Sequence, residues 1–371
     1  MATVAVVKVG EGTENIVAAC RQAISISGGL KENIRPGWTV LVKPNLVAPV
    51  PAAVTNFDVL AAVVQEIIDA GATPVIGDCS GFEYDSYTTF DILGIRDLAQ
   101  QLGVEVVNFE EDRYIEVPFD HPRIRRVKIA ATAVESEAIV NVPKMKCHKL
   151  TDVSLAIKNC FGMLHKSSRR EVHAKGLDAG IAALYKLFRP VMSVMEGLVI
   201  PVSGAVYGEY MSMGVIAAST DMLALDLFAS KLLGFERSDV KHLKLAARGR
   251  SPLIDIAGDE VEPVDIAAGS SKLRKNLYRH LYATVYASDH YLSNFGVKSL
   301  IPWFHSRFGI HPVIDWKRCS YCDACAAACP VNAIDIESEK LDYGQCSKAR
   351  CLMCVNMCPN GAVTIKQSFK S

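Results

Sequence analysis

The last part of the chain contains a cysteine pattern that constrains its fold and its chemistry together. Eight of the twelve cysteines in this chain of 371 residues lie between Cys319 and Cys358. They form two runs that each end in Cys-Pro. The first reads C-x2-C-x2-C-x3-C-P up to Pro330, and the second reads C-x4-C-x2-C-x3-C-P up to Pro359. Thiols at this density in a reducing compartment favour metal ligation over disulfides. We therefore expect metal centres in this segment.

The two runs belong to an internal repeat over residues 311–367. Each half contains a short apolar stretch ending in Asp-Trp or Asp-Tyr, a cysteine run and a second apolar stretch. This segment resembles the bacterial dicluster ferredoxins, in which the fourth cysteine of each run ligates the other cluster. The resemblance implies two [4Fe-4S] clusters, one held by Cys319, Cys322, Cys325 and Cys358 and the other by Cys346, Cys351, Cys354 and Cys329.

One gap departs from the ferredoxin pattern, because four residues separate Cys346 from Cys351 where two are usual. The longer gap enlarges one loop and removes no ligand. A pair of zinc sites is the alternative, but zinc usually takes two C-x2-C pairs with a longer spacer, which neither run provides. Two neighbouring clusters relay single electrons, so we expect this iron–sulfur segment to serve electron transport.

The first 268 residues alternate short apolar runs with amphipathic stretches. Strands are expected at residues 4–9, 39–47, 74–78, 104–109, 138–142, 192–200 and 213–218, and helices at 14–27, 58–70, 95–102 and 223–233. This alternation predicts the α/β fold class, with a largely parallel sheet layered between helices. Ligands of such folds lie beyond the carboxyl ends of the strands.

The composition changes near residue 269. Eight aromatic residues occur within residues 278–308, several of them at helical spacing. We expect an aromatic-rich helical linker at 269–310, which packs one domain on the next. The predicted domains are then an α/β domain of unknown function at 1–268 and a small α+β, dicluster ferredoxin-like domain at 311–371.

Charge and hydropathy exclude two classes of partner. Lys and Arg number 40, as do Asp and Glu, so the formal net charge is zero, which argues against binding to nucleic acid. No run of about eighteen uncharged apolar residues occurs, which argues against a membrane span. The first residues lack the features of a secretory leader. We expect a cytoplasmic protein, either alone or as a homo-oligomer.

The neutral total conceals a basic segment at residues 144–175, with eight Lys or Arg and two acids. Lys144, Lys146 and His148 follow an apolar run at a period of two, which places them on one face if the chain stays extended. Arg169 and Arg170 are expected on a solvated face instead. Lysines at strand ends are suited to carboxylate or phosphate, so Lys144 is a candidate substrate ligand.

Two further stretches extend this candidate site. Lys43 and Asn45 end the apolar run at 39–47, and Lys158 and Asn159 are expected on an apolar helix at 153–163. We predict that Lys43, Asn45, Lys144, Lys158 and Asn159 bind an anionic substrate. Lys146 and His148 are the predicted catalytic residues, because imidazole titrates near neutrality and can move a proton.

The stretches VLVKPNLV, AGA-x-P-x-IGD-x-SG, VPKMK-x-H-x-LT and SLAIKN-x-FGML resemble domain-of-unknown-function family three-six-two, over about residues 4–258. The resemblance implies iron–sulfur binding, since members often carry a C-terminal dicluster ferredoxin module. Glu196 stands where members commonly have Asp, which keeps the carboxylate on a longer arm. The loop at 77–81 matches no nucleotide-binding fingerprint, but its backbone could bind an anion.

These features support two hypotheses of function. The first is a ferredoxin-linked oxidoreductase that acts on a small anionic substrate at the basic junction. The second is a non-enzymatic electron carrier or accessory factor for a partner redox protein, with the aromatic linker and the acidic stretch at 105–120 as docking surfaces.

Overall fold

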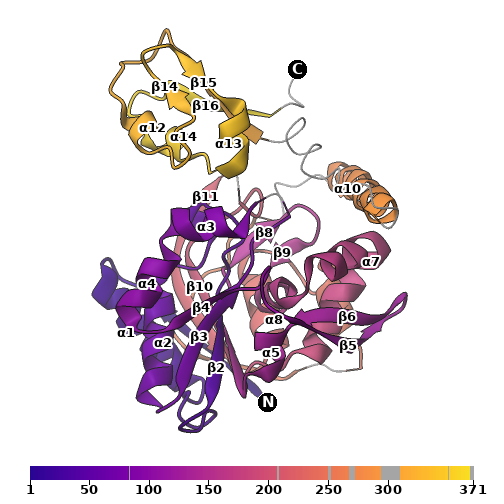
Figure 1. Cartoon of the computed structure of the whole chain (residues 1–371). Helices are drawn as coiled ribbons and strands as arrows, with labels where there is room; N and C mark the ends of the chain where they lie inside the picture. Colours follow the sequence, from indigo (N-terminus) through magenta and orange to yellow (C-terminus); the bar gives the residue numbers. More distant parts are fainter. Residues whose placement is uncertain are drawn as a thin grey trace.

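An eight-stranded sheet forms the centre of the computed structural model, which describes residues 1–82, 84–206, 209–249, 252–266, 272–293, 310–349 and 351–367. The strand order is β12-β1-β11-β10-β7-β2-β3-β4. Figure 1 labels β2, β3, β4, β10 and β11 of this sheet. Every neighbouring pair is parallel except the two pairs that contain β11. The bounds are β1 Ala2–Lys8, β2 Thr39–Lys43, β3 Thr73–Asp78, β4 Glu105–Asn108, β7 Ala138–Asn141, β10 Met192–Pro201, β11 Tyr210–Ser219 and β12 Ile254–Gly258.

Helices cover both faces of this sheet, because successive strand residues point to opposite sides. Val40 and Val42 pack with α1, α2 and α4 in one core, whereas Leu41 packs with α6, α7, α8 and α9 in the other. The predicted α/β class with a largely parallel, layered sheet is confirmed. The bounds are α1 Thr13–Ile26, α2 Phe57–Asp69, α4 Ile95–Leu102, α6 Ala156–Asn159, α7 Lys166–Leu187, α8 Met222–Leu232 and α9 Lys241–Ala246.

Shorter elements surround the carboxyl ends of the strands. The hairpin of β8 and β9 lies beside β10, and α3 follows the loop that leaves β3. A second hairpin, β5 with β6, packs on α7. The bounds are η1 Pro51–Ala53, α3 Ser86–Leu93, β5 Tyr114–His121, β6 Ile124–Ala130, α5 Ala131–Glu135, β8 Lys146–His148, β9 Asp152–Ser154 and η2 Cys160–Met163.

The prediction of one helix over residues 153–163 is wrong. Its first residues belong to β9, and α6 begins only at Ala156. The buried carboxylate of Asp226 on α8 accepts the backbone N–H groups of Ala156, at 2.7 Å, and Ile157, at 3.0 Å. Asp226 thus binds the N–H groups that the first turn of α6 leaves unpaired, which fixes the point where that helix begins.

The C-terminal segment has two similar halves. Its outer strands β13 and β16 pair antiparallel, so the start of one half lies beside the end of the other. Asp323 and Leu352 both adopt left-handed backbone angles immediately before α12 and α14. The bounds are α10 Lys272–Ser293, β13 Ile310–Ile314, α12 Ala324–Ala327, β14 Ile334–Asp335, β15 Lys340–Leu341, α13 Tyr343–Ala349, α14 Met353–Met357 and β16 Val363–Gln367.

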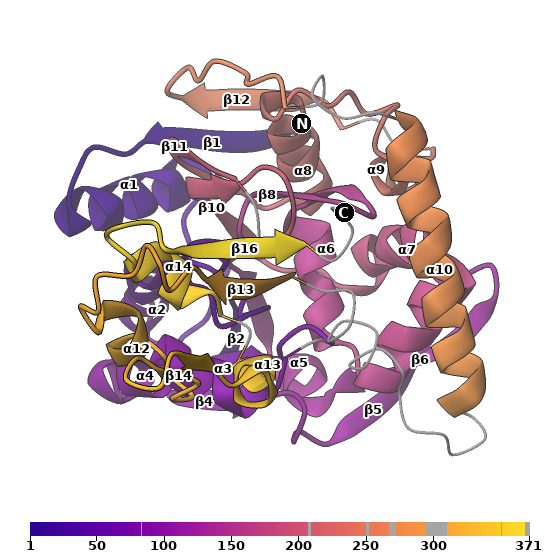
Figure 2. The ribbon, with the colours of Figure 1, turned by 90° about the horizontal axis from the view of Figure 1, so that it is seen from above.

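The helix α10 lies along α7, as Figure 2 shows from above. Tyr286 of α10 is buried against the ring of His173 on α7, and Arg170 lies 3.6 Å from Asp289. The rest of the aromatic stretch, at 294–309, lies outside the described residues. Within the described ranges, no helix is both long enough and apolar enough to cross a membrane.

Candidate functional site

The connections of the sheet reverse direction between β2 and β7. From β2 the chain proceeds to β3 and β4 on one side, whereas from β7 it proceeds to β10 and β11 on the other. The two strands are adjacent and parallel, with Lys43 opposite Asn141 at their carboxyl ends. Open α/β sheets bind ligands at such a switch point. We call the side chains at these two strand ends and on the following loops the β2–β7 junction.

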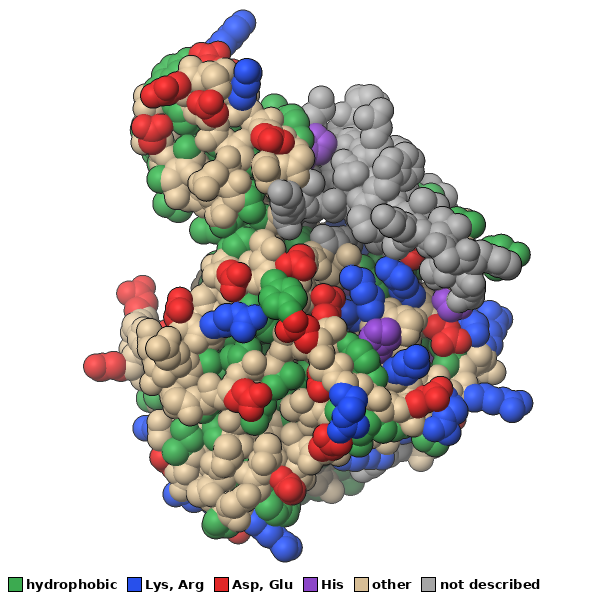
Figure 3. Space-filling model, viewed as in Figure 1, with side chains coloured by type: hydrophobic (Ala, Val, Ile, Leu, Met, Phe, Trp, Pro, Cys, Tyr) green, Lys and Arg blue, Asp and Glu red, His purple; other side chains and the backbone are tan. Residues whose placement is uncertain are grey.

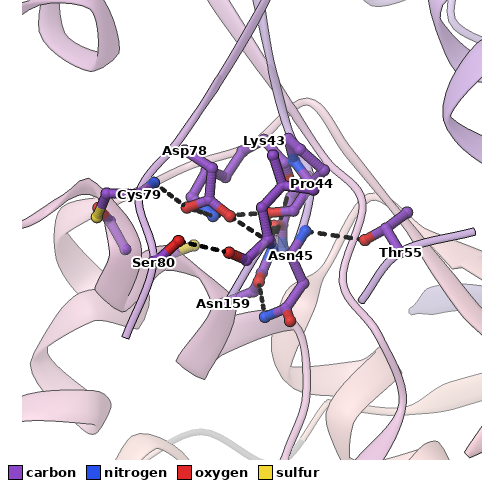
Figure 4. Close-up of polar contacts among 12 residues, drawn as sticks. Lys43, Pro44, Asn45, Thr55, Asp78, Cys79, Ser80 and Asn159 are labelled. Carbon is purple, nitrogen blue, oxygen red and sulfur yellow. Dashed lines mark hydrogen bonds and ion pairs between the residues drawn. The ribbon is translucent and has the colours of Figure 1, made fainter. Parts of the chain in front are cut away.

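A buried ion pair closes one side of the junction. The Lys43 ammonium lies 2.7 Å from Oδ1 of Asp78, and each side chain is at most 3% exposed. Asp78 also accepts the backbone N–H groups of Cys79, at 2.7 Å, and Leu46, at 2.6 Å (Figure 4). A side chain at Gly162 would place its Cβ 2.7 Å from the same carboxylate. Packing and charge therefore fix the Lys43–Asp78 pair.

Asparagine amides connect the loops that meet here. The Asn159 amide nitrogen donates to Oδ1 of Asn141, at 2.8 Å, and to the carbonyls of Lys43 and Pro44. Its Oδ1 accepts a hydrogen bond from the Asn45 amide, also at 2.8 Å (Figure 4). The predicted ligands Lys43, Asn45 and Asn159 are thus brought together by contacts among themselves. Their predicted contact with an anion stays a prediction.

Lys146 reaches the same network from β8. Its ammonium donates to Oδ1 of Asn45, at 2.8 Å, and to the Ala53 carbonyl, at 3.1 Å, and the side chain is 2% exposed. Burial, followed by the charges of Lys158 and Lys144, lowers the pKa of Lys146 well below its ordinary value. No carboxylate contacts this ammonium among the described residues.

Lys144, in contrast, has a carboxylate partner. Its ammonium lies 2.5 Å from Oε2 of Glu196 on β10, and neither side chain is more than 3% exposed. Glu196 also accepts the backbone N–H groups of Asn56, at 3.3 Å, and Leu198, at 2.7 Å. Glu196 on β10 therefore connects its own strand with Lys144 and with the chain at Asn56. The predicted role of Lys144 as a substrate ligand stays a prediction.

His148 lies at the partly exposed end of β8. Its Nδ1 accepts the backbone N–H of Leu150, at 3.1 Å, which leaves the proton of the neutral ring on Nε2. Burial, followed by the charges of Lys158 and Lys146, lowers the pKa of His148 well below its ordinary value. The ring is therefore neutral at physiological pH and presents a donor.

Two histidines that the sequence reasoning gave no role lie near Lys158. His173 of α7 stacks on Tyr286, with ring centroids 4.4 Å apart, and meets Phe161 edge-on. His242 of α9 is fully buried, with Nδ1 3.8 Å from Asp178, and neither ring nitrogen has a hydrogen-bond partner among the described residues. Nothing in the sequence indicates that these side chains meet, because they lie on separate helices far apart in the chain.

The positive charge of Lys158 acts on all of these groups. It lowers the pKa of Lys146, His148, His173 and His242, after burial in each case. Lys158 itself is half-buried, on α6. The structure therefore places Lys158 near Lys146 and His148 and adds the two histidines of α7 and α9. The predicted catalytic and binding roles of these residues stay predictions.

Two expectations are wrong, one about Arg169 and one about the loop at 77–81. Arg169 is not on a solvated face: it is 4% exposed, donates to the Ser80 carbonyl at 2.8 Å, and lies 5.0 Å over the ring of Phe82. Exposed basic side chains occur instead on the nearby hairpin, where Arg125 of β6 is one. Figure 3 shows Lys and Arg side chains gathered on one side of the α/β domain.

The loop at 77–81 is not an anion receptor. Its N–H groups at Cys79, Ser80 and Gly81 donate to the Asp78 carboxylate, the Ser86 hydroxyl and the Val47 carbonyl, respectively. With these donors occupied inside the protein, the backbone has none to offer a ligand at those three positions.

The C-terminal cysteines surround a second candidate site. A small pocket is lined by Cys329, Cys346, Cys351 and Cys354 together with apolar side chains such as Ile334. Burial and then the neighbouring thiols Cys346, Cys351 and Cys329 raise the pKa of Cys354 to about 12. Four thiols from both halves of the repeat thus face one apolar space, a donor set that suits a thiolate-ligated cluster.

The other four cysteines are arranged differently. Burial raises the pKa of Cys325, and the nearby thiols of Cys319 and Cys358 add to this effect. Cys322 is the one exposed cysteine among the eight of the segment, all of which the structure describes. The same N–H to sulfur contact recurs in the two halves, from Ala333 to Cys329 and from Ala362 to Cys358, each at 3.2 Å.

Comparisons with known proteins match both parts of the chain. The family model described as "Domain of unknown function (DUF362)" matches residues 40–231, and a model described as "4Fe-4S binding domain" matches residues 312–335. A thylakoid-associated protein of Synechocystis sp. is 26% identical over 260 residues, which cover 67% of this chain and 79% of that protein. A ferredoxin of Methanothermococcus thermolithotrophicus is 32% identical over 57 residues, 15% of this chain and 95% of the ferredoxin.

A solved structure is also similar to the chain. It is that of the lactate racemase apoprotein from Thermoanaerobacterium thermosaccharolyticum, with a TM-score of 0.44 and 11% sequence identity. The similarity covers 62% of this chain and 56% of that one, so the chain spans little more than half of the protein it matches.

The Lys144–Glu196 pair leads to a prediction about stability. Glu196→Gln leaves a buried ammonium without its carboxylate, so it should lower the free energy of unfolding by about 3–5 kcal/mol. Lys144→Met should cost a similar amount, and the double variant should cost less than the sum. Urea denaturation under argon measures all three. Asp120→Asn, which breaks an exposed pair with Lys186, is the control and should cost less than about 1 kcal/mol. Strict additivity of the two single variants would contradict the pairing.

His173 leads to a prediction about pH. Burial, followed by the charges of Lys158 and Arg169, lowers the pKa of His173 to about 3, whereas an unfolded histidine titrates near 6.5. Between these values the unfolded chain binds a proton that the folded chain does not, so stability falls as the pH falls below about 6.5. His173→Phe keeps a ring against Tyr286 and removes the titration. Its unfolding free energy should fall less than that of the wild type between about pH 7.5 and about pH 5.5. An equal fall in both proteins would show that His173 is not buried as a neutral ring.

Proposed function

The chain belongs to the DUF362 family and carries a 4Fe-4S binding domain, and on this premise we propose that it is a ferredoxin-linked oxidoreductase acting on a small anionic substrate at the β2–β7 junction. The iron–sulfur domain is consistent with electron transfer. We propose the division into an α/β domain at 1–268, a helical linker at 269–310 and a ferredoxin-like domain at 311–371.

Two [4Fe-4S] clusters are part of the proposal. The pocket bounded by Cys329, Cys346, Cys351 and Cys354 supports the second ligand set, because one of its thiols comes from the other half of the repeat. The effect of Cys319 and Cys358 on Cys325 supports the first set, which Cys322 completes. The ferredoxin similarity, which covers 95% of that protein, supports a complete ferredoxin-like unit.

Zinc in place of the clusters fits less well. A single zinc ion needs its ligands within one small tetrahedron. The two cysteine runs, each ending in Cys-Pro, do not match the two C-x2-C pairs with a longer spacer that zinc sites usually have. Thiolates around a cubane stand further apart than those around one zinc ion.

The observation that carries the substrate site is the buried ammonium of Lys146, which donates to the Asn45 amide oxygen and the Ala53 carbonyl. The ammonium groups of Lys43 and Lys144 have buried carboxylate partners, so in this proposal they hold the strand ends in place. Lys146 has only neutral partners, and Lys158 lies close enough to lower its pKa. A bound carboxylate or phosphate would stabilise both ammonium groups and raise the pKa of Lys146.

In this proposal the clusters supply electrons and His148 supplies a proton. The clusters, when bound, supply single electrons of low potential. His148 lies at the open side of the junction with its proton on Nε2, where it can donate a hydrogen bond to the anion. Once protonated it is a strong acid, because its pKa is held low, so it can deliver a proton to a reduced substrate.

A non-enzymatic electron carrier or accessory factor is the second candidate. It is supported by the exposure of Cys322 in the first ligand set, which gives a partner protein access to that cluster. In this candidate the α/β domain binds a partner redox protein, and the junction residues serve only its fold. The experiment below distinguishes the two.

Variants at the junction test the proposed activity. Reduced protein is mixed under argon with a panel of small carboxylates and phosphates, and reoxidation of the clusters is followed by absorbance. For an anion that reoxidises the wild type, His148→Gln should lower kcat by about 10²–10⁴-fold, and Lys146→Met should mainly raise KM. Lys244→Met removes an exposed lysine of α9 and should leave the rate unchanged. Unchanged turnover in both junction variants would contradict the proposal. Reoxidation only through another protein would establish the carrier instead.

A further inference from the structure

We propose that the two clusters have fixed and different positions in the path of electrons through this protein. The inner cluster, held by Cys329, Cys346, Cys351 and Cys354, lies beside the α/β domain and delivers electrons to it. The outer cluster, held by Cys319, Cys322, Cys325 and Cys358, faces solvent and receives them. This inference rests on the two ligand sets of the proposed function.

The placement of the inner cluster follows from one contact between the domains. The helix α13, which contains Cys346, contacts α3 of the α/β domain (Figure 1). The other ligands from the second half, Cys351 and Cys354, are both buried. The inner ligand set is therefore anchored on the element that touches the α/β domain. Two of its four thiols are buried, and Cys329 and Cys346 are half-buried.

The contacted helix leads directly to the β2–β7 junction. The loop before α3 leaves β3 at Asp78, whose carboxylate binds Lys43. Within that loop, the N–H of Ser80 donates to the hydroxyl of Ser86, the first residue of α3, at 2.8 Å. A short run of chain, braced by this hydrogen bond, thus connects the surface under α13 with the junction.

The outer ligand set has the opposite environment. Cys322 is exposed, and its neighbour Tyr321 is 50% exposed. Met357, next to the ligand Cys358, is also 50% exposed. Exposed side chains thus flank the outer set in both halves of the repeat, so an external donor reaches this cluster without passing the inner one.

The electron count is simple for this order. With both clusters bound, an external one-electron donor, such as dithionite or a reduced carrier protein, would lose one electron and the outer cluster would change from the 2+ to the 1+ state. The outer cluster would return to 2+ by reducing the inner one, which would return to 2+ by reducing the substrate of the proposed function by one electron. No proton is needed for the transfer to either cluster, since neither cluster has an open coordination position.

A paramagnetic label on α3 tests the order without measuring activity. Tyr87 is 44% exposed on α3, and Tyr87→Cys accepts a gadolinium chelate once the clusters have assembled, because the four cysteines outside the repeat are buried. Electron paramagnetic resonance of the reduced protein then reports how strongly the label accelerates the relaxation of each cluster. Cys351→Ser and Cys322→Ser identify the inner and outer signals, since each changes the spectrum of one cluster.

The inner cluster should relax several-fold faster than the outer one in the labelled protein. Asp255→Cys, at an exposed position of β12 on the opposite edge of the sheet, is the matched control and should affect both clusters weakly. Faster relaxation of the outer cluster, or equal effects from Tyr87→Cys, would overturn the proposed order. A protein that assembles only one cluster would instead contradict the two ligand sets, so the two failures are distinguishable.

Discussion

The buried ion pair between Lys43 and Asp78 holds the carboxyl ends of two neighbouring strands in one arrangement. Each ion would cost several kcal/mol to bury alone, and the pair offsets this cost only when its remaining hydrogen-bond positions are filled. Here Asp78 also binds two backbone N–H groups, and Gly162 leaves room for the carboxylate. The loops after β2 and β3 are therefore fixed relative to each other.

The Lys43–Asp78 pair positions the groups that are proposed to act on a substrate. The loop after β2 carries Asn45, whose amide binds both Asn159 and the ammonium of Lys146. The ammonium of Lys146 then has an amide oxygen and a backbone carbonyl as its acceptors at the switch point, and Lys158 and His148 lie near it. The loop after β3 leads to α3, which contacts the ferredoxin-like segment. One ion pair thus links the proposed substrate site to the proposed entry of electrons.

The layered sheet and the cysteine segment could be predicted from the sequence because both depend on local patterns. Continuous apolar runs between amphipathic stretches identified the strands, and the spacing within the cysteine runs identified the iron–sulfur domain. The partners of the lysines could not be predicted, since Asp78 and Glu196 lie far along the chain from Lys43 and Lys144. Both lysines were therefore interpreted as receptors for an external anion, although each has a carboxylate partner inside the protein.

Other errors have the same origin. Apolar spacing favoured one helix at 153–163, but Asp226 on α8 binds the N–H groups that set where α6 begins. Arg169 was expected in solvent because it stands in a charged run, whereas Ser80 and Phe82, from a distant loop, enclose it. His242 was missed because only the packing of α9 brings it near Lys158. Local patterns thus identified the elements, and tertiary contacts decided what their polar residues do.

The most direct measurement is quantitative analysis of iron, sulfide and unpaired spins in protein purified without oxygen. Two cubane clusters require about eight irons and about eight sulfides per chain. Full reduction should give two unpaired spins per chain, with spectral broadening from the interaction of two neighbouring clusters. A colourless protein that contains zinc, or a chain with four irons and a single isolated spin, would contradict the two-cluster relay.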